Sequence, residues 1–184
     1  MKKHNISLLC LQETKIAENK QESSRPDDTW YFSGENKTCT TSVFEAGVAI
    51  VLANPVKKYL KEIEPISDRL MSITLQAPMP IAYICAYAIP ATRPGMCKAE
   101  QEVLNAQKDT FYEQLAHSFQ KHTTAGPTHV MGDFNARLEK CASNREAAFI
   151  GPRTFDINRS VNPHKKAPST QYNRRSLLDF CRDA

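Results

Sequence analysis

The amino-acid sequence predicts an α/β protein with mixed β-sheets. Strand-like segments are interleaved with helical ones, a pattern typical of α/β proteins. Several strand-like segments follow one another directly, which favours mixed sheets over a purely parallel, doubly wound sheet. The length of 184 residues suits one compact unit, so we expect a single domain over residues 1–184.

The first part of the chain contains three predicted strands. Residues 6–12 form a nearly continuous apolar run, which predicts a strand covered on both faces. Residues 15–28 are polar and predict a loop. Residues 30–32 and 47–52 predict two further strands, the second of them rich in β-branched side chains.

Two more strands and a helix are predicted in the middle of the chain. Residues 70–75 alternate apolar and polar side chains and predict a half-buried strand. Residues 81–87 predict its neighbour, joined to it by a tight turn that contains proline. Residues 98–122 predict a long helix that packs on a sheet, because its apolar side chains fall on one face. These are Leu104, Phe111, Leu115 and Phe119.

The last part of the chain is less regular. Residues 128–131 predict a strand that runs directly into Gly132 and Asp133. Residues 139–170 have no periodicity and contain several prolines, which is typical of a functional loop or of a disordered segment. Residues 173–182 predict a final helix with one apolar side.

The composition excludes several classes of protein. No stretch approaches the roughly 18 apolar residues needed to cross a bilayer, and the apolar run near the N-terminus is too short for a signal peptide. The six cysteines occur singly, without zinc-binding spacing, so we expect reduced thiols and an intracellular protein. Cys10 and Cys85 lie in apolar runs, where a thiol behaves as a small hydrophobe.

The net charge of +4 is unevenly distributed. Residues 1–136 carry 14 basic against 15 acidic side chains, whereas residues 137–184 carry 10 against 5. A basic segment of this kind suits a polyanionic partner such as nucleic acid. On charge alone, a solvated loop explains it equally well.

Glu13 is the first residue that could carry chemistry. It follows the first predicted strand, at the point where the backbone leaves the core. A carboxylate in this position can hold a hard cation such as Mg²⁺, which takes oxygen ligands and keeps several waters. The alternative is an exposed glutamate that opens a loop.

Asp133 and Asn135 lie in the second chemical motif, Gly132-Asp133-Phe134-Asn135-Ala136. In extended backbone, residues two apart point to the same face, which would place both side chains together and Phe134 in the core. A carboxylate can take a proton from an attacking water, and a neutral amide can donate hydrogen bonds to a phosphate oxygen. The alternative is a strand followed by an Asx-type turn.

Tyr87 closes a predicted strand and has two interpretations. A phenol can donate a hydrogen bond to a non-bridging phosphate oxygen, or it can pack half-buried at the edge of a sheet. The histidines have no metal-binding or nucleophile-pairing neighbour in the sequence and are interpreted as structural or solvated. They are His4, His117, His122, His129 and His164.

In combination, these motifs resemble the endonuclease/exonuclease/phosphatase superfamily. Their order is Gln-Glu-Thr at 12–14, Gly-Val-Ala-Ile at 47–50, a strand ending in Tyr-Ala at 87–88, a helix, and the motif at 132–136. The segments at 150–152 and 173–181 resemble the endonuclease domain of non-LTR (LINE-type) retrotransposons. The resemblance implies a four-layer α/β sandwich of two mixed β-sheets packed face to face, and it favours nicking of DNA.

The resemblance also implies a role for each candidate residue. Glu13 matches a metal-binding glutamate, for Mg²⁺ with Mn²⁺ as a substitute. Tyr87 matches an active-site tyrosine, Asp133 an aspartate that activates or positions the nucleophile, and Asn135 an asparagine that contacts the phosphate. DNA is the implied partner, with no membrane and no obligate protein partner, and a nuclear location follows if the protein acts on genomic DNA.

The sequence departs from the family pattern at both ends. The family has an asparagine well before the glutamate, and Asn5 lies too close to Glu13 to match it. The family also ends in a Ser-Asp-His motif, which this sequence lacks. We therefore expect a domain that is incomplete at both ends and lacks its first and last strands.

Three functions are compatible with these observations. The first is a Mg²⁺-dependent DNA endonuclease of retrotransposon origin. The second is a catalytically inactive remnant or nucleic-acid-binding module of the same fold. The third is a phosphatase of the same superfamily that acts on lipid or inositol phosphates.

Overall fold

A computed structural model describes residues 1–16, 18–25, 27–34, 46–76, 78–90, 95–138, 141, 143–144, 146–151 and 168–184. The chain forms two compact units. The first comprises Met1–Tyr87 and His117–Asp133, and the second comprises Ala88–Ala116 and Phe134–Ala184. The single domain over residues 1–184 stays a prediction.

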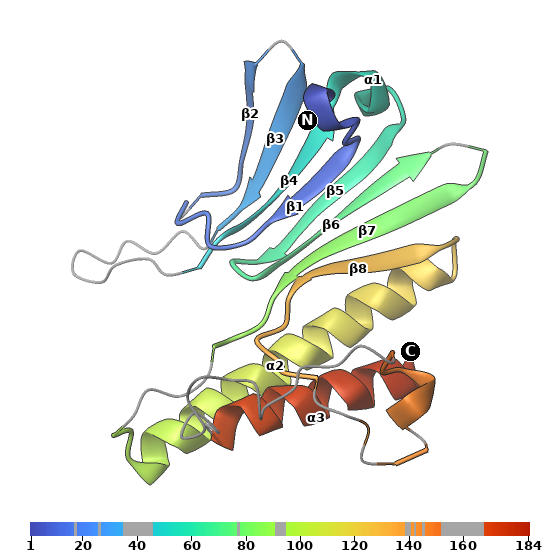
Figure 1. Cartoon of the computed structure of the whole chain (residues 1–184). Helices are drawn as coiled ribbons and strands as arrows, with labels where there is room; N and C mark the ends of the chain where they lie inside the picture. Colours follow the sequence, from blue (N-terminus) through green and yellow to red (C-terminus); the bar gives the residue numbers. More distant parts are fainter. Residues whose placement is uncertain are drawn as a thin grey trace. The chain divides into compact units, whose positions relative to one another are not determined.

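Two four-stranded sheets form the first unit (Figure 1). The first sheet has the order β1-β4-β3-β2, and all its neighbouring strands are antiparallel. The second sheet has the order β5-β6-β7-β8 and is mixed, because β7 and β8 are parallel. The strands are β1 (Leu8–Leu11), β2 (Lys20–Arg25), β3 (Asp28–Ser33), β4 (Val48–Ala53), β5 (Leu60–Ser67), β6 (Leu70–Gln76), β7 (Pro80–Tyr87) and β8 (Thr128–Asp133).

The hydrophobic core of the first unit lies between its two sheets. β4 and β6 each have a strand on both sides. β4 consists mostly of branched apolar residues, which pack well on a pleated surface, and β6 is buried along almost its whole length. Ile50 and Leu52 of β4 are fully buried against Met71 and Ile73 of β6. This face-to-face packing fixes the positions of the strand ends that carry the candidate site.

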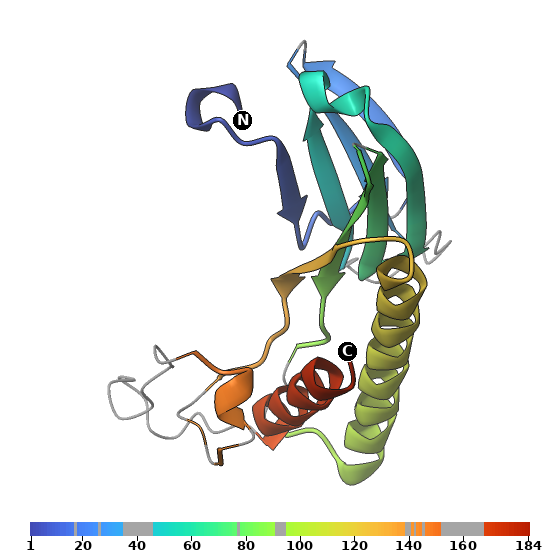
Figure 2. The same ribbon diagram turned by 90° about the vertical axis from the view of Figure 1, so that its right-hand side faces the viewer.

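Two long helices complete the described structure: α2 (Lys98–Thr123) and α3 (Pro168–Asp183). The last turns of α2 pack on the second sheet, where His122 Nε2 lies 3.0 Å from Ser72 Oγ. In the second unit, α3 lies beside the N-terminal part of α2 (Figures 1 and 2), and the hydroxyl of Tyr112 donates to the carbonyl oxygen of Asn173. The short helices are η1 (Lys2–His4), α1 (Asn54–Lys57) and η2 (Glu146–Ala148).

Two predictions about the first sheet and its surroundings were wrong in detail. β1 is not covered on both faces: it pairs only with β4 among the described residues, and Leu9 is 36 % exposed. The predicted loop at 15–28 contains β2, which pairs with β3. The sequence Lys-Gln-Glu-Ser-Ser-Arg has low strand propensity, but the backbone hydrogen bonds of a neighbouring strand override that weak preference.

The second sheet also differs from expectation. Residues 70–75 are buried on both faces rather than half-buried, because β6 lies between β5 and β7 and α2 covers its outer face near Ser72. β5 was not predicted, since its charged residues and Pro65 hide its strand character. The final helix begins at Pro168 rather than at residue 173. Most of the irregular segment at 139–170 lies outside the described residues.

No helix in the described part of the chain is both long enough and apolar enough to span a membrane.

Candidate active site

Glu13 and Tyr87 meet at the ends of two strands from different sheets. The phenol of Tyr87 donates a hydrogen bond of 2.8 Å to Oε1 of Glu13. Tyr87 is only 4 % exposed, whereas Glu13 is exposed. Burial and then the bond to Glu13 raise the pKa of Tyr87 to about 12. The phenol is therefore protonated at neutral pH and acts as a hydrogen-bond donor, not as a base.

The backbone that carries Glu13 is held in an uncommon conformation. Glu13 and Lys15 both have a φ of 55°, which L-residues other than glycine rarely adopt. The N–H groups of Thr14 and Lys15 donate to the carbonyl oxygens of Gly47 and Ala46 at 3.0 and 2.9 Å. A β-carbon on Gly47 would lie 2.4 Å from Thr14 Oγ1. Gly47 therefore permits the close approach that fixes Glu13, and strain of this kind is often kept at functional sites.

Asp133 lies beside Tyr87 on the neighbouring strand. The two residues are register partners in the parallel pair of β7 and β8, so their side chains share a face of the sheet. β7 and β8 approach each other unusually closely at the preceding register pair, Ala86 and Gly132. A β-carbon on Gly132 would lie 1.8 Å from the carbonyl oxygen of Ala86. Because only glycine fits there, Gly132 sets the place of the exposed Asp133.

Arg69 is part of this site, although the sequence analysis did not identify it. Its guanidinium carbon lies 4.9 Å from the centre of the Tyr87 ring, and its carbonyl oxygen accepts the N–H of Tyr87 at 2.8 Å. The guanidinium also hydrogen-bonds the phenol and opposes the rise in its pKa. Nη1 of Arg69 is buried and has no hydrogen-bond partner among the described residues. The sequence contained one signal that could have identified Arg69: it is a basic residue directly before the apolar strand segment at 70–75.

Asn135 belongs to the second unit. Its backbone is not extended, although the sequence analysis assumed an extended backbone from Asp133 to Asn135. β8 ends at Asp133, and Asn135 has a φ of 46°. The alternation of an extended strand therefore does not continue to Asn135, and the expectation that its side chain shares a face with Asp133 is unsupported. Its amide donates to the carbonyl oxygen of Ala88 at 2.8 Å. Phe134 is half-buried.

Asn173 on α3 was also not identified from the sequence. Its side chain is fully buried, and its amide donates to the carbonyl oxygens of Ile89 at 2.9 Å, Asn135 at 3.3 Å and Phe134 at 3.4 Å. It thereby ties together the segments that follow β7 and β8. The available signal was an asparagine four residues before Leu177, on the apolar side of the predicted helix.

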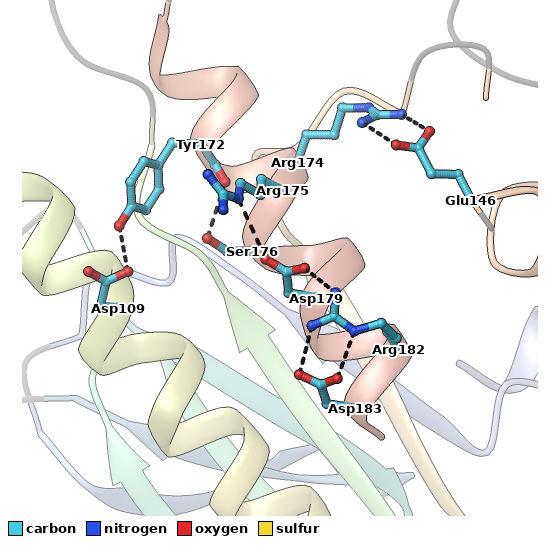
Figure 3. Close-up of polar contacts among 9 residues, drawn as sticks. All are labelled: Asp109, Glu146, Tyr172, Arg174, Arg175, Ser176, Asp179, Arg182 and Asp183. Carbon is cyan, nitrogen blue, oxygen red and sulfur yellow. Dashed lines mark hydrogen bonds and ion pairs between the residues drawn. The ribbon is translucent and has the colours of Figure 1, made fainter. Parts of the chain in front are cut away.

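The arginines of α3 are paired with acidic side chains (Figure 3). Arg174 forms a bidentate ion pair with Glu146: Nη1 donates to Oε1 at 3.2 Å and Nη2 donates to Oε2 at 2.7 Å. Arg182 lies 3.0 Å from Asp179 and 2.9 Å from Asp183. Residues 168–184 thus hold three basic and two acidic side chains. Most of the basic excess of the C-terminal segment lies in residues 137–167, much of which is outside the described residues.

A second cluster of functional groups resembles a hydrolase triad but lacks its geometry. Ser72 Oγ lies 3.0 Å and Glu64 Oε2 lies 3.8 Å from the same nitrogen, Nε2 of His122. A Ser-His-acid triad needs the serine and the carboxylate on opposite ring nitrogens. His122 is 6 % exposed and anchors the end of α2, which agrees with the structural interpretation of the histidines.

The candidate site contains two carboxylates, which are oxygen donors of the kind that Mg²⁺ takes. Among the described residues there is no group of three or more His, Cys, Asp or Glu side chains that could form a metal cage. The carboxylate of Glu13 accepts the hydrogen bond of Tyr87, and Asp133 is the register partner of Tyr87 on the neighbouring strand. Mg²⁺ is commonly bound through one or two carboxylates and retains several waters, so this donor set fits it.

A shallow apolar hollow of about 420 Å³ lies elsewhere, on the N-terminal part of α2, lined by residues that include Met96, Val103 and Leu104. It contains none of the candidate site residues.

The comparisons identify the fold. No protein-family model matches the sequence, and no curated protein matches it either. The crystal structure of the Xenopus laevis APE2 catalytic domain is similar to this chain, with a TM-score of 0.54 and 17 % sequence identity. The fold of this chain is similar to that of the APE2 catalytic domain. The predicted α/β class with two packed sheets is confirmed. The similarity covers 97 % of this chain and 60 % of the APE2 chain, so this chain spans about 60 % of the length of its structural neighbour.

Proposed function

We propose that this chain carries part of the active site of a metal-dependent phosphodiesterase that nicks DNA. The observation that carries the proposal is the meeting of Glu13, Tyr87 and Asp133 at adjoining strand ends. These residues come from motifs that are far apart in the sequence, and the fold of a catalytic domain supports their interpretation as one site. Glu13 would hold Mg²⁺, or Mn²⁺ in its place, and the bound ion would supply positive charge that polarises the phosphate.

Each side chain has a definite chemical role in this proposal. The carboxylate of Asp133 orients the attacking water and accepts its proton. With a metal ion bound to Glu13, the neutral phenol of Tyr87 would move its single hydrogen bond from Glu13 to a non-bridging phosphate oxygen as charge develops there. Arg69 places a permanent positive charge beside the phenol. Asn135 contacts the phosphate, a role that rests on the sequence resemblance.

The substrate class rests on two observations. The segments at 150–152 and 173–181 resemble retrotransposon endonucleases, and the C-terminal segment carries a basic excess suited to the phosphates of duplex DNA. Retrotransposon origin and a nuclear location belong to the same proposal. A catalytically inactive, DNA-binding domain and a phosphatase for lipid or inositol phosphates are the competing functions.

A nicking assay tests the proposal. The purified chain is incubated with supercoiled plasmid and Mg²⁺, alongside Asp133→Asn, Glu13→Gln and the distant control Glu113→Gln. We expect Mg²⁺-dependent nicking that falls at least about 100-fold in the two site variants and is unchanged in the control. Equal nicking by Asp133→Asn would overturn the assignment. A folded chain that binds plasmid in a salt-dependent way without nicking it would favour the binding module, and turnover of inositol phosphates would favour the phosphatase.

A further inference from the structure

Cys10 and Cys85 face each other between the two sheets of the first unit. Cys10 lies in β1 and is half-buried, whereas Cys85 lies in β7 and is fully buried. Their thiols are joined by a hydrogen bond. The sulfur of Cys85 also lies 3.5 Å from Nε2 of Gln12 and 3.6 Å from the carbonyl oxygen of Leu11. The thiol of β7 is therefore surrounded by the end of β1.

The surroundings make the two thiols chemically different. The hydrogen bond from Cys10 and the amide of Gln12 lower the pKa of Cys85, because both donate to its sulfur and favour the thiolate. The same contact with Cys85, together with burial, raises the pKa of Cys10. Cys85 is thus the sulfur that more readily becomes a thiolate, and Cys10 is the more exposed sulfur, which a reagent meets first.

We propose that Cys10 and Cys85 form an oxidative modification site, which a small disulfide oxidant converts into an intramolecular disulfide. In the first step Cys10, the more exposed sulfur, loses its proton to solvent and attacks the oxidant, which releases one thiol; the raised pKa of Cys10 makes this the slow step. The thiolate of Cys85 then attacks the sulfur of Cys10 and releases the second. The two cysteines lose two electrons and two protons, and the oxidant is reduced to two thiols.

The position of the pair links this modification to the candidate site. Cys10 lies three residues before Glu13, and Cys85 lies two residues before Tyr87. β1 pairs only with β4 among the described residues, and formation of the bridge requires the two sulfurs to come to disulfide bonding distance. The disulfide would join the two strands that carry Glu13 and Tyr87. It would also close a loop of about 75 residues in the unfolded chain, which favours the folded state.

The test uses the whole chain and bis(2-hydroxyethyl) disulfide as the oxidant. After alkylation of the remaining thiols, mass spectrometry should show a loss of 2 Da and a peptide that links Cys10 to Cys85. Dithiothreitol should reverse both changes. The oxidised protein should also unfold at a temperature at least about 5 °C higher than the reduced protein. The control variant Cys97→Ser, which changes an exposed cysteine, should still form the bridge between Cys10 and Cys85.

Two variants keep the test decisive. Cys10→Ser on the edge strand and Cys85→Ala should both lose the bridge and the rise in unfolding temperature. A stable mixed disulfide on Cys10 with no bridge would overturn the proposal. So would bridging to Cys97, Cys141 or Cys181 at a comparable rate, or bridging of Cys10 and Cys85 that is no faster in the native protein than in urea.

Discussion

Tyr87 and Glu13 are separated by 74 residues in the sequence, yet a hydrogen bond of 2.8 Å joins their side chains. The bond connects the end of β7 in one sheet to the segment after β1 in the other. The bond also adds to the effect of burial, and the two together raise the pKa of Tyr87 to about 12.

Removing the phenol should weaken the fold measurably. In Tyr87→Phe the ring still packs, but Glu13 loses a donor to its charged oxygen. Hydrogen bonds to charged groups contribute about 1.5–3 kcal/mol, and exposure of Glu13 reduces this, so we expect a loss of about 1 kcal/mol in the free energy of unfolding. Urea denaturation measures it. Tyr59→Phe, at an exposed tyrosine, should be nearly neutral, and equal effects of the two changes would contradict the prediction.

Gly132→Ala should be far more damaging than its size suggests. The new β-carbon would lie 1.8 Å from the carbonyl oxygen of Ala86, so β7 and β8 must move apart. We expect a loss of more than about 2 kcal/mol in the free energy of unfolding, as is usual when packed backbone is forced to shift. Gly151→Ala is the matched control, because nothing lies within 4 Å of its β-carbon. If both variants unfold at the same urea concentration, the strand pairing at Gly132 is not as close as described.

The buried His122 should make stability depend on pH. Burial, and then the charge of Lys121, lower the pKa of His122 below its ordinary value of 6.5, although Glu64 and Glu62 oppose the shift. The unfolded chain then binds the proton more readily than the folded one. The contribution of His122 to stability is complete above about pH 6.5 and is lost as the pH falls.

The comparison variant for this pH dependence is His122→Gln, which cannot titrate but can still bond to Ser72. When the pH is lowered from 7.5 to 5, the free energy of unfolding should decrease less in this variant than in the unmodified chain. His117→Gln, at an exposed histidine of the same helix, should leave the pH dependence unchanged. A parallel decline in all three proteins would show that His122 does not carry the effect.

Asn173→Ala should destabilise the second unit. The substitution removes the amide that donates to Ile89, Phe134 and Asn135 and leaves their carbonyl oxygens without this donor. Unpaired buried polar groups cost about 1–3 kcal/mol, so we expect a loss of about 2–3 kcal/mol. Hydrogen exchange at residues 134–138 should also become faster. Gln171→Ala, on the exposed side of α3, should change neither quantity.

Elements with a strong local signal were predictable from the sequence. The branched apolar residues of β4 and the apolar face of α2 specify their own conformation, because burial rewards these patterns wherever the core lies. β2 and β5 were missed for the opposite reason. Their polar and charged residues form strands only because a neighbouring strand supplies the backbone partners.

The candidate site shows the same division. The sequence by itself determined which residues could act, since Glu13, Tyr87 and Asp133 each follow or end an apolar strand segment. Only the tertiary structure decided that Tyr87 bonds to Glu13, that Asp133 lies beside it, and that Arg69 covers its ring. It also decided that Asn135 leaves the extended conformation. Strand propensity and side-chain alternation are local properties, whereas these contacts depend on the pairing of β7 with β8 and on the packing of one sheet against another, which no local pattern encodes.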